Sequence, residues 1–256
     1  MSATTISTRL TSLGRAEFSL LLRNRTAMFT ALAVPVGTVV SSNSFMSNGL
    51  TSKSALNVGQ MTLSAGIGMV LIMIIYSTLV ASYVTRREEK VLKRLRTGEC
   101  SDWEILLSTA LPVIALGLAQ LALLIVGISV FMDVAAPQRP DLLAVGVLLG
   151  IALMVLLAGV TAVISKTVES SQVTVMPLML VSMFTSGMII PLDAMPDTAA
   201  RICQSLPLTP AIQLAQGGLQ GGMPGTEVLT ALGSALAWTA LAVFAVRRWF
   251  RWEPRH

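Results

Sequence analysis

Histidine is almost absent from this sequence, and its scarcity bounds the chemistry that the chain can perform. The single histidine is His256, the last residue. A Ser/His intramembrane protease, a histidine-ligated metal site and a proton relay through imidazole all require a histidine inside the fold. We therefore expect this chain to contain no catalytic residue and no metal site.

The adjacent carboxylates Glu88 and Glu89 are the remaining candidates for acid-base chemistry. They resemble the start of the EExxxR pattern of membrane-embedded CAAX-type proteases, but Lys93 stands where the arginine belongs and Arg94 comes one residue late. No histidine or further acidic group lies in the middle of an apolar segment to complete such a site. A solvated, charged helix explains the pair better than a catalytic dyad does.

The amino-acid composition indicates which structural elements carry these residues. It is the composition of a membrane protein. Hydrophobic residues make up 54% of the chain and charged residues only 12%, and the mean hydropathy is +0.74. A transmembrane helix needs roughly 20 mainly apolar residues. The sequence thus predicts an all-α, polytopic protein with six transmembrane helices in a single membrane domain, 1–256. The predicted spans are 27–46, 59–84, 105–132, 142–164, 172–190 and 226–246.

The charges fall almost entirely outside these spans, and their distribution predicts the orientation. Five spans lack Asp, Glu, Lys, Arg and His, and the sixth has only Glu227 near one end. Of the 18 Lys and Arg residues, 15 lie in 1–26, 85–104, 165–171 and 247–256. Basic residues concentrate in short cytoplasmic segments. Both termini are therefore expected in the cytoplasm, and the basic charge is explained by topology and lipid headgroups, so we expect no nucleic-acid binding.

Three segments between or before the spans have patterns of their own. Residues 1–26 place leucines on one helical face and Arg, Ser and Thr on the other, which predicts an amphipathic helix at the membrane surface. Residues 85–104 form a charged cytoplasmic loop with a short helix that ends before Gly98. Residues 191–225 are divided by prolines and glycines, yet 199–206 and 211–219 are apolar, which predicts short helices in an external or re-entrant segment.

The energy source of such a protein has to come from elsewhere. No ionisable residue lies near the middle of a span to couple transport to protons or sodium, and no GxxxxGK[ST] phosphate-binding loop is present. A soluble ATPase partner would need a cytoplasmic projection to act on, and the charged helix 86–96, with Leu92 and Leu95 on one face, is the strong candidate. The alternative is that these charges serve only topology and headgroup binding.

Two motifs resemble those of the type 2 ABC transporter permeases, a family that includes drug, antibiotic and polysaccharide exporters. The first is RREEKVLKRLRTGECSDWEILLSTALP, residues 86–112, with a charged helix, an LRTG turn and an entry into span three. The second is GMIIPLDAMPDTAARICQSLPLTPAIQLAQG, residues 187–217, with PLxxMP followed by LPLTP. Within this family, the sequence as a whole resembles the daunorubicin-resistance-like multidrug exporters of the bacterial cell membrane more than the sugar-polymer exporters.

This resemblance implies a permease dimer above two ABC ATPase subunits that bind ATP and magnesium, with no cofactor on this chain. It also implies that the loop between spans two and three contacts the ATPase, and that spans two and five line a translocation path for an apolar drug-like, lipid-like or antibiotic substrate. The implied coupling residues are Arg86, Arg87, Glu88, Glu89, Lys90, Leu92, Lys93, Leu95, Arg96 and Thr97. The implied path residues are Ser64, Gly68, Met69, Ile72, Tyr76, Thr174, Pro177, Met179, Met183 and Thr185.

Two other functions fit the same pattern of spans. The chain could be a non-transport membrane subunit that confers immunity or acts as a sensor, or a carrier that couples to an ion held by carbonyl and hydroxyl oxygens. Substrate identity, direction of transport and the choice between homodimer and heterodimer stay open at this point. Two glycine pairs, Gly66 with Gly68 and Gly146 with Gly150, have the spacing that allows helices to approach closely, although packing within a span is the better explanation for each pair taken alone.

Overall fold

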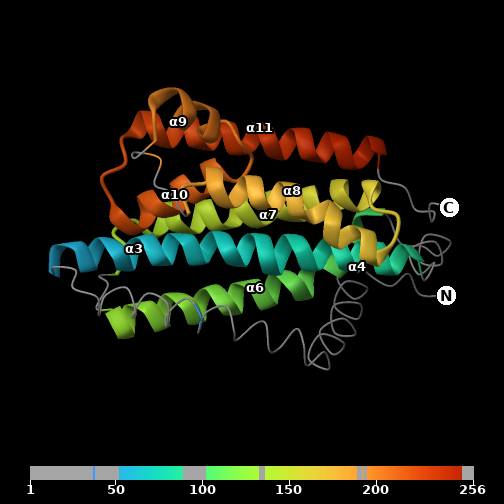
Figure 1. Ribbon diagram of the computed structural model, residues 1–256, viewed down its shortest axis with the longest axis horizontal. Helices are drawn as coiled ribbons and strands as arrows, with labels where there is room; N and C mark the ends of the chain where they lie inside the picture. The colour runs from blue at the N-terminus through green and yellow to red at the C-terminus, as the bar shows by residue number, and fades with distance from the viewer. Residues whose placement is uncertain are drawn as a thin grey trace, which may run out of the picture.

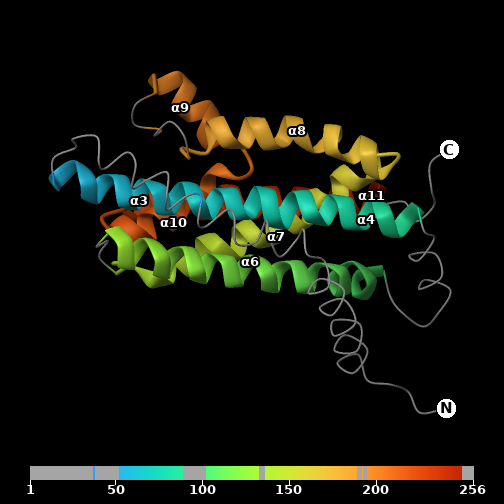
Figure 2. The same ribbon diagram turned by 60° about the horizontal axis from the view of Figure 1, so that its bottom comes forward.

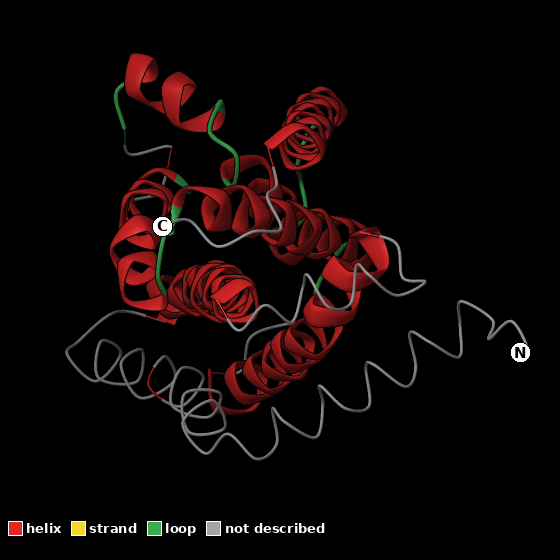
Figure 3. Ribbon diagram, turned by 90° about the vertical axis from the view of Figure 1, so that its right-hand side faces the viewer, coloured by secondary structure: helices red, strands yellow, loops and turns green. Residues whose placement is uncertain are grey.

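The computed structural model describes residues 37, 52–88, 102–132, 136–188, 192 and 195–249. Within these ranges the regular elements are helices and no strand occurs (Figure 3). The prediction of an all-α protein is confirmed for this part of the chain. The predicted surface helix 1–26, the predicted first span 27–46 apart from residue 37, and residues 89–101 of the charged loop lie outside the described residues.

The longest rod is made of three consecutive helical segments. They are α3 (Ser52–Met69), the π-helical segment η1 (Val70–Ser77) and α4 (Thr78–Glu88). The rod runs through the molecule beside α6 (Asp102–Met132) and α7 (Pro140–Ile164) (Figures 1 and 2). Its middle is strongly apolar, and the side chains of Leu71, Ile75 and Leu79 are almost fully buried. This rod is therefore the centre of the hydrophobic core.

The remaining helices in the described part of the chain are two long ones and two short ones. They are α8 (Val168–Thr185), α9 (Asp197–Gln204), α10 (Thr209–Gln220) and α11 (Gly225–Trp249). Their beginnings follow from local sequence. Pro140 opens α7, where a missing N–H costs nothing. At α8, Thr167 Oγ1 accepts the N–H of Ser170 at 3.1 Å and Ser170 Oγ accepts that of Thr167 at 2.9 Å, a reciprocal capping box.

Four described helices are long and apolar enough to cross a membrane. They are Gly59–Glu88, Leu106–Val130, Pro140–Ile164 and Gly225–Arg248, which overlap predicted spans two, three, four and six. Predicted span five, 172–190, coincides in part with α8, which is not among the four. Its first turns contain the polar residues Glu169, Ser170, Ser171 and Gln172, so α8 begins earlier and is less apolar than the predicted span.

Helix α10 is short but buried, and small residues allow it to be so. It packs against α7, α11 and α3, and most of its residues are buried. A side-chain carbon at Gly218 would lie 2.4 Å from the backbone nitrogen of Leu143, and one at Gly146 would lie 2.7 Å from the carbonyl oxygen of Ala211. The backbones of α7 and α10 therefore touch at these two glycines, and Arg139 N–H donates to Gly218 O at 3.0 Å.

We expect the substitution Gly218→Ala to separate α7 from α10, since the added methyl group would meet backbone rather than a movable side chain. Overpacking of this kind costs on the order of 1–3 kcal/mol. The control is Gly233→Ala in α11, where nothing lies within 4 Å of the new carbon. Thermal unfolding of the detergent-solubilised protein should show a lower midpoint for Gly218→Ala alone. Equal midpoints would contradict the close backbone contact.

Candidate functional site

Arg87, at the end of α4, is buried within the chain and caps the end of α7. Its guanidinium donates to the carbonyl oxygen of Ala162 at 2.7 Å, to that of Ser165, and at 3.5 Å to that of Lys166. Only 2% of the residue is exposed. The last carbonyls of a helix have no partner within the helix, and a cation at this end also interacts favourably with the helix dipole. Arg87 satisfies both requirements of α7.

Glu88 makes a second link from the same helix end to α8. Its Oε1 accepts the N–H of Val168, the first residue of α8, at 3.3 Å. A carboxylate at a helix N-terminus is favourable for the same electrostatic reason as a cation at a C-terminus. The turn 165–167 between α7 and α8 is thus held by two adjacent residues of α4, one bound to each of its flanking helices.

Arg87 and Glu88 follow Arg86, the first residue of the predicted coupling segment. The structure places Arg86 half-buried, Arg87 buried and Glu88 exposed at the end of α4. Arg87 therefore faces the interior of its own chain rather than outward. The other predicted coupling residues lie outside the described part of the chain: Glu89, Lys90, Leu92, Lys93, Leu95, Arg96 and Thr97.

The predicted path residues of span two lie mostly in the core. Ser64, Gly68, Ile72 and Tyr76 are buried, and Met69 is half-buried. The Tyr76 hydroxyl lies 2.9 Å from Thr161 Oγ1 of α7, so the polar end of this ring is satisfied inside the chain.

The predicted path residues of span five lie along α8, beside the same rod. Pro177 is exposed, while Thr174, Met179, Met183 and Thr185 are half-buried. Met179 and Met183 pack against the core cluster that contains Ile72 and Tyr76. Helix α8 also contacts η1, which carries Ile72 and Tyr76, and α4, so the two predicted sets lie on neighbouring helices.

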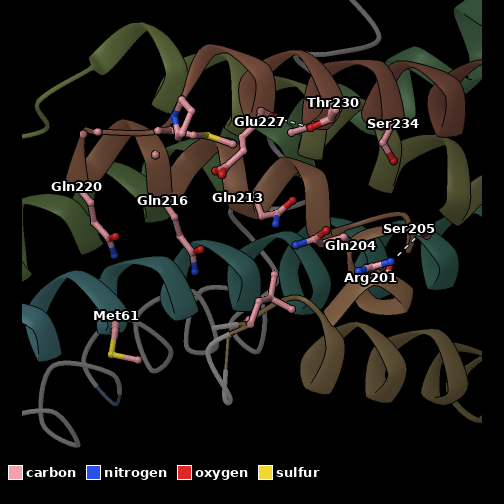
Figure 4. A pocket seen from close by; sticks show the side chains of 18 residues that line it. Met61, Arg201, Gln204, Ser205, Gln213, Gln216, Gln220, Glu227, Thr230 and Ser234 are labelled. Carbon is pink, nitrogen blue, oxygen red and sulfur yellow. Dashed lines mark hydrogen bonds between the residues drawn. The ribbon is translucent and has the colours of Figure 1, made fainter. Parts of the chain in front are cut away.

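A polar cleft of about 970 Å³ lies at the other end of the molecule, between α9, α10, α11 and the start of α3 (Figure 4). Four glutamines line it, together with one arginine and one glutamate. These and the remaining polar lining residues are Gln204, Gln213, Gln216, Gln220, Arg201, Glu227, Ser205, Thr230 and Ser234. Gln216 and Gln220 point from α10 toward α3 (Figure 4).

The sequence contains a pattern that indicates this cleft, which was missed because residues 211–219 were interpreted as an apolar helix. Gln213, Gln216 and Gln220 recur at the i, i+3, i+7 spacing that places side chains on one face of a helix. The cleft does not have the composition of a metal centre. No cluster of three or more His, Cys, Asp or Glu side chains with the geometry to hold a metal occurs among the described residues.

Replacing Arg87 by Met should destabilise the protein, because the apolar side chain leaves the end carbonyls of α7 without their cap. Each hydrogen bond to a charged group contributes roughly 1.5–3 kcal/mol. Arg248→Met is the matched control, since Arg248 is exposed in the last turn of α11. Thermal unfolding in detergent measures the difference, and equal stability of the two variants would contradict a capping role for Arg87.

Comparison with known proteins identifies the family. The model of the family described as ABC-2 family transporter protein matches residues 4–247. Comparison with curated proteins finds no significant match. The family match spans nearly the whole chain, including α3 to α11. The chain therefore belongs to the ABC-2 transporter family, as a membrane permease component of an ABC transporter that has no ATPase site of its own.

Proposed function

We propose that this chain is the transmembrane half of an ATP-driven exporter, which moves an apolar drug-like, lipid-like or antibiotic substrate out of a bacterial cell. It works as a dimer of permeases on two ABC ATPases, with both termini in the cytoplasm. The family match supports the permease role, and the absence of a phosphate-binding loop in the sequence requires that ATP hydrolysis occurs on a partner.

One observation carries the coupling part of this proposal. Arg87 and Glu88, which lead directly into the charged segment 89–97, bind the turn between α7 and α8. A displacement of that segment by the ATPase would therefore act on the ends of three helices at once. We infer that Arg86 and residues 89–97 contact the ATPase, while Arg87 and Glu88 transmit the displacement to α7 and α8.

The mechanism that follows is alternating access. ATP binding closes the two ATPase subunits, the segment 86–97 moves with them, and the path beside α8 changes from inward to outward opening. A partner can shift such an equilibrium only if it binds the two states differently. The half-buried methionines of the predicted path, Met69, Met179 and Met183, suit bulky apolar ligands because thioether chains repack easily.

The double substitution Leu92→Glu, Leu95→Glu tests the ATPase contact. Carboxylates at these positions should abolish both co-purification with the co-expressed ATPase and ATP-dependent transport in reconstituted vesicles. The control, Thr198→Glu with Thr226→Glu, adds the same charge at exposed positions at the other end of the molecule. If the first variant keeps both activities, the segment serves topology alone. If no ATPase associates with the wild type, a sensor, an immunity protein or an ion-coupled carrier becomes the better explanation.

The substitution Arg87→Lys distinguishes a role in transmitting the ATPase-driven displacement to α7 from a role in binding the ATPase. Lysine keeps the charge but lacks the guanidinium fork that reaches several carbonyls at once. We expect ATPase association to persist while ATP-dependent transport falls by about ten-fold, which corresponds to roughly 1.4 kcal/mol. The measurement is transport per ATP hydrolysed, and Arg248→Lys serves as the control. Unchanged transport by Arg87→Lys would contradict transmission through this residue.

A further inference from the structure

The polar cleft is unusual because three of its four glutamines, Gln213, Gln216 and Gln220, belong to α10, a helix that is otherwise buried. Apart from these glutamines, the residues of α10 from Thr209 to Leu219 are buried. Gln213 and Gln216 are half-buried, and Gln220 is exposed. None of the three side chains makes a hydrogen bond to another residue that the structure describes. A polar group that is partly withdrawn from bulk water, as in Gln213 and Gln216, is costly without hydrogen-bond partners, so water or a ligand in the cleft has to supply them.

The position of the cleft connects it with the predicted path. Met61, which lines the cleft, lies on α3 two helical turns before Gly68 and therefore on the same face. Gly187, another lining residue, follows Thr185 by two positions. The cleft also lies at the end opposite Arg87. By the orientation that the charges predict, this is the outer end of the molecule.

The chemistry of the lining selects the class of ligand. Each glutamine offers two N–H donors and a carbonyl acceptor, which match hydroxyl groups because a hydroxyl both donates and accepts. Arg201 and Glu227 contribute one charge of each sign, so the cleft has no net charge that would attract an ion. A volume of about 970 Å³ lies at the upper end of the range for small-molecule sites.

We propose that this cleft binds the uncharged, hydroxyl-rich part of an amphiphilic molecule, such as a glycosyl group, whose apolar part occupies the path beside α8. The proposal deepens the transport function and rests on it for the identity of the ligand as cargo. Gln204 reaches the cleft from α9, while Gln213, Gln216 and Gln220 reach it from α10 (Figure 4). Together these side chains form the hydrogen-bonding wall for the hydroxyl groups.

The test uses the purified full chain in lipid nanodiscs without the ATPase, so that its result is independent of coupling. The background is Cys100→Ser with Cys203→Ala, which removes both native cysteines. Gln216→Cys is then treated with the charged, membrane-impermeant reagent methanethiosulfonate ethylsulfonate. We expect it to react at least about ten-fold faster than Ala215→Cys, because Ala215 is buried and thiol modification requires access.

Protection of the same cysteine identifies the ligand class. Octyl β-D-glucoside, below its micelle-forming concentration, should slow the modification of Gln216→Cys by about five-fold or more, since a bound glycosyl group blocks access to the thiol. Octyl sulfobetaine has the same chain and a zwitterionic head group, and it should have little effect. Thr198→Cys, exposed and outside the cleft, should react equally with and without either compound.

Three results would overturn the proposal. An unreactive Gln216→Cys would mean that water does not enter the cleft, and equal protection by the two amphiphiles would mean that the head group is not recognised. Equal slowing at Thr198→Cys would show a general effect of the glucoside. Gln204→Cys, on α9, repeats the test if Gln216→Cys does not elute as a single species. Any of these failures leaves ATPase association unaffected, whereas loss of that association would leave the cysteine results standing.

Discussion

The constraint on which this structure depends is that backbone N–H and C=O groups in hydrocarbon must find partners within the protein. Helices satisfy this requirement along their length but leave their ends unsatisfied. Three of the described ends are met by specific side chains. Arg87 caps α7, Glu88 accepts an N–H at the start of α8, and Thr209 Oγ1 donates to the carbonyl oxygen of Thr185 at the end of α8 at 3.3 Å. Each of these contacts also joins elements that are distant in sequence.

The fold was predictable from sequence where apolar runs are long and uninterrupted. The helices that contain Leu71, Leu124 and Leu153 follow directly from such runs, since no other element can carry them across a bilayer. The beginning of α8 was not predictable in this way, because its first turns are polar and are fixed by the capping box of Thr167 and Ser170. Hydropathy detects residues that favour an apolar environment. It does not detect a helix start that is stabilised by hydrogen bonds of polar capping residues.

The candidate site was predictable only in outline, because a charge pattern does not show which group each charged side chain contacts. An arginine that caps a neighbouring helix and one that faces a partner have the same sequence signature, so the capping role of Arg87 required the position of α7. Likewise, the burial of α10 depends on two glycines. Gly146 of α7 meets the backbone of α10, and Gly218 of α10 meets the backbone of α7. Their spacing permits a close approach but does not say which helix makes it. The glutamines of α10 were not recognised as a polar face, because the residues between them are apolar and the segment was interpreted as apolar.

Helix α7 connects the end of the molecule at Arg87 with the end that carries the polar cleft. Its last carbonyls bind Arg87, and its first turns touch the backbone of α10, whose opposite face carries the glutamines of the cleft. A helix of 25 residues is about 37 Å long and stiff along its axis. Helix α7 is therefore a direct structural link between Arg87 at one end and α10 at the other. Close backbone packing at Gly146 and Gly218 leaves little room for α7 and α10 to move relative to each other.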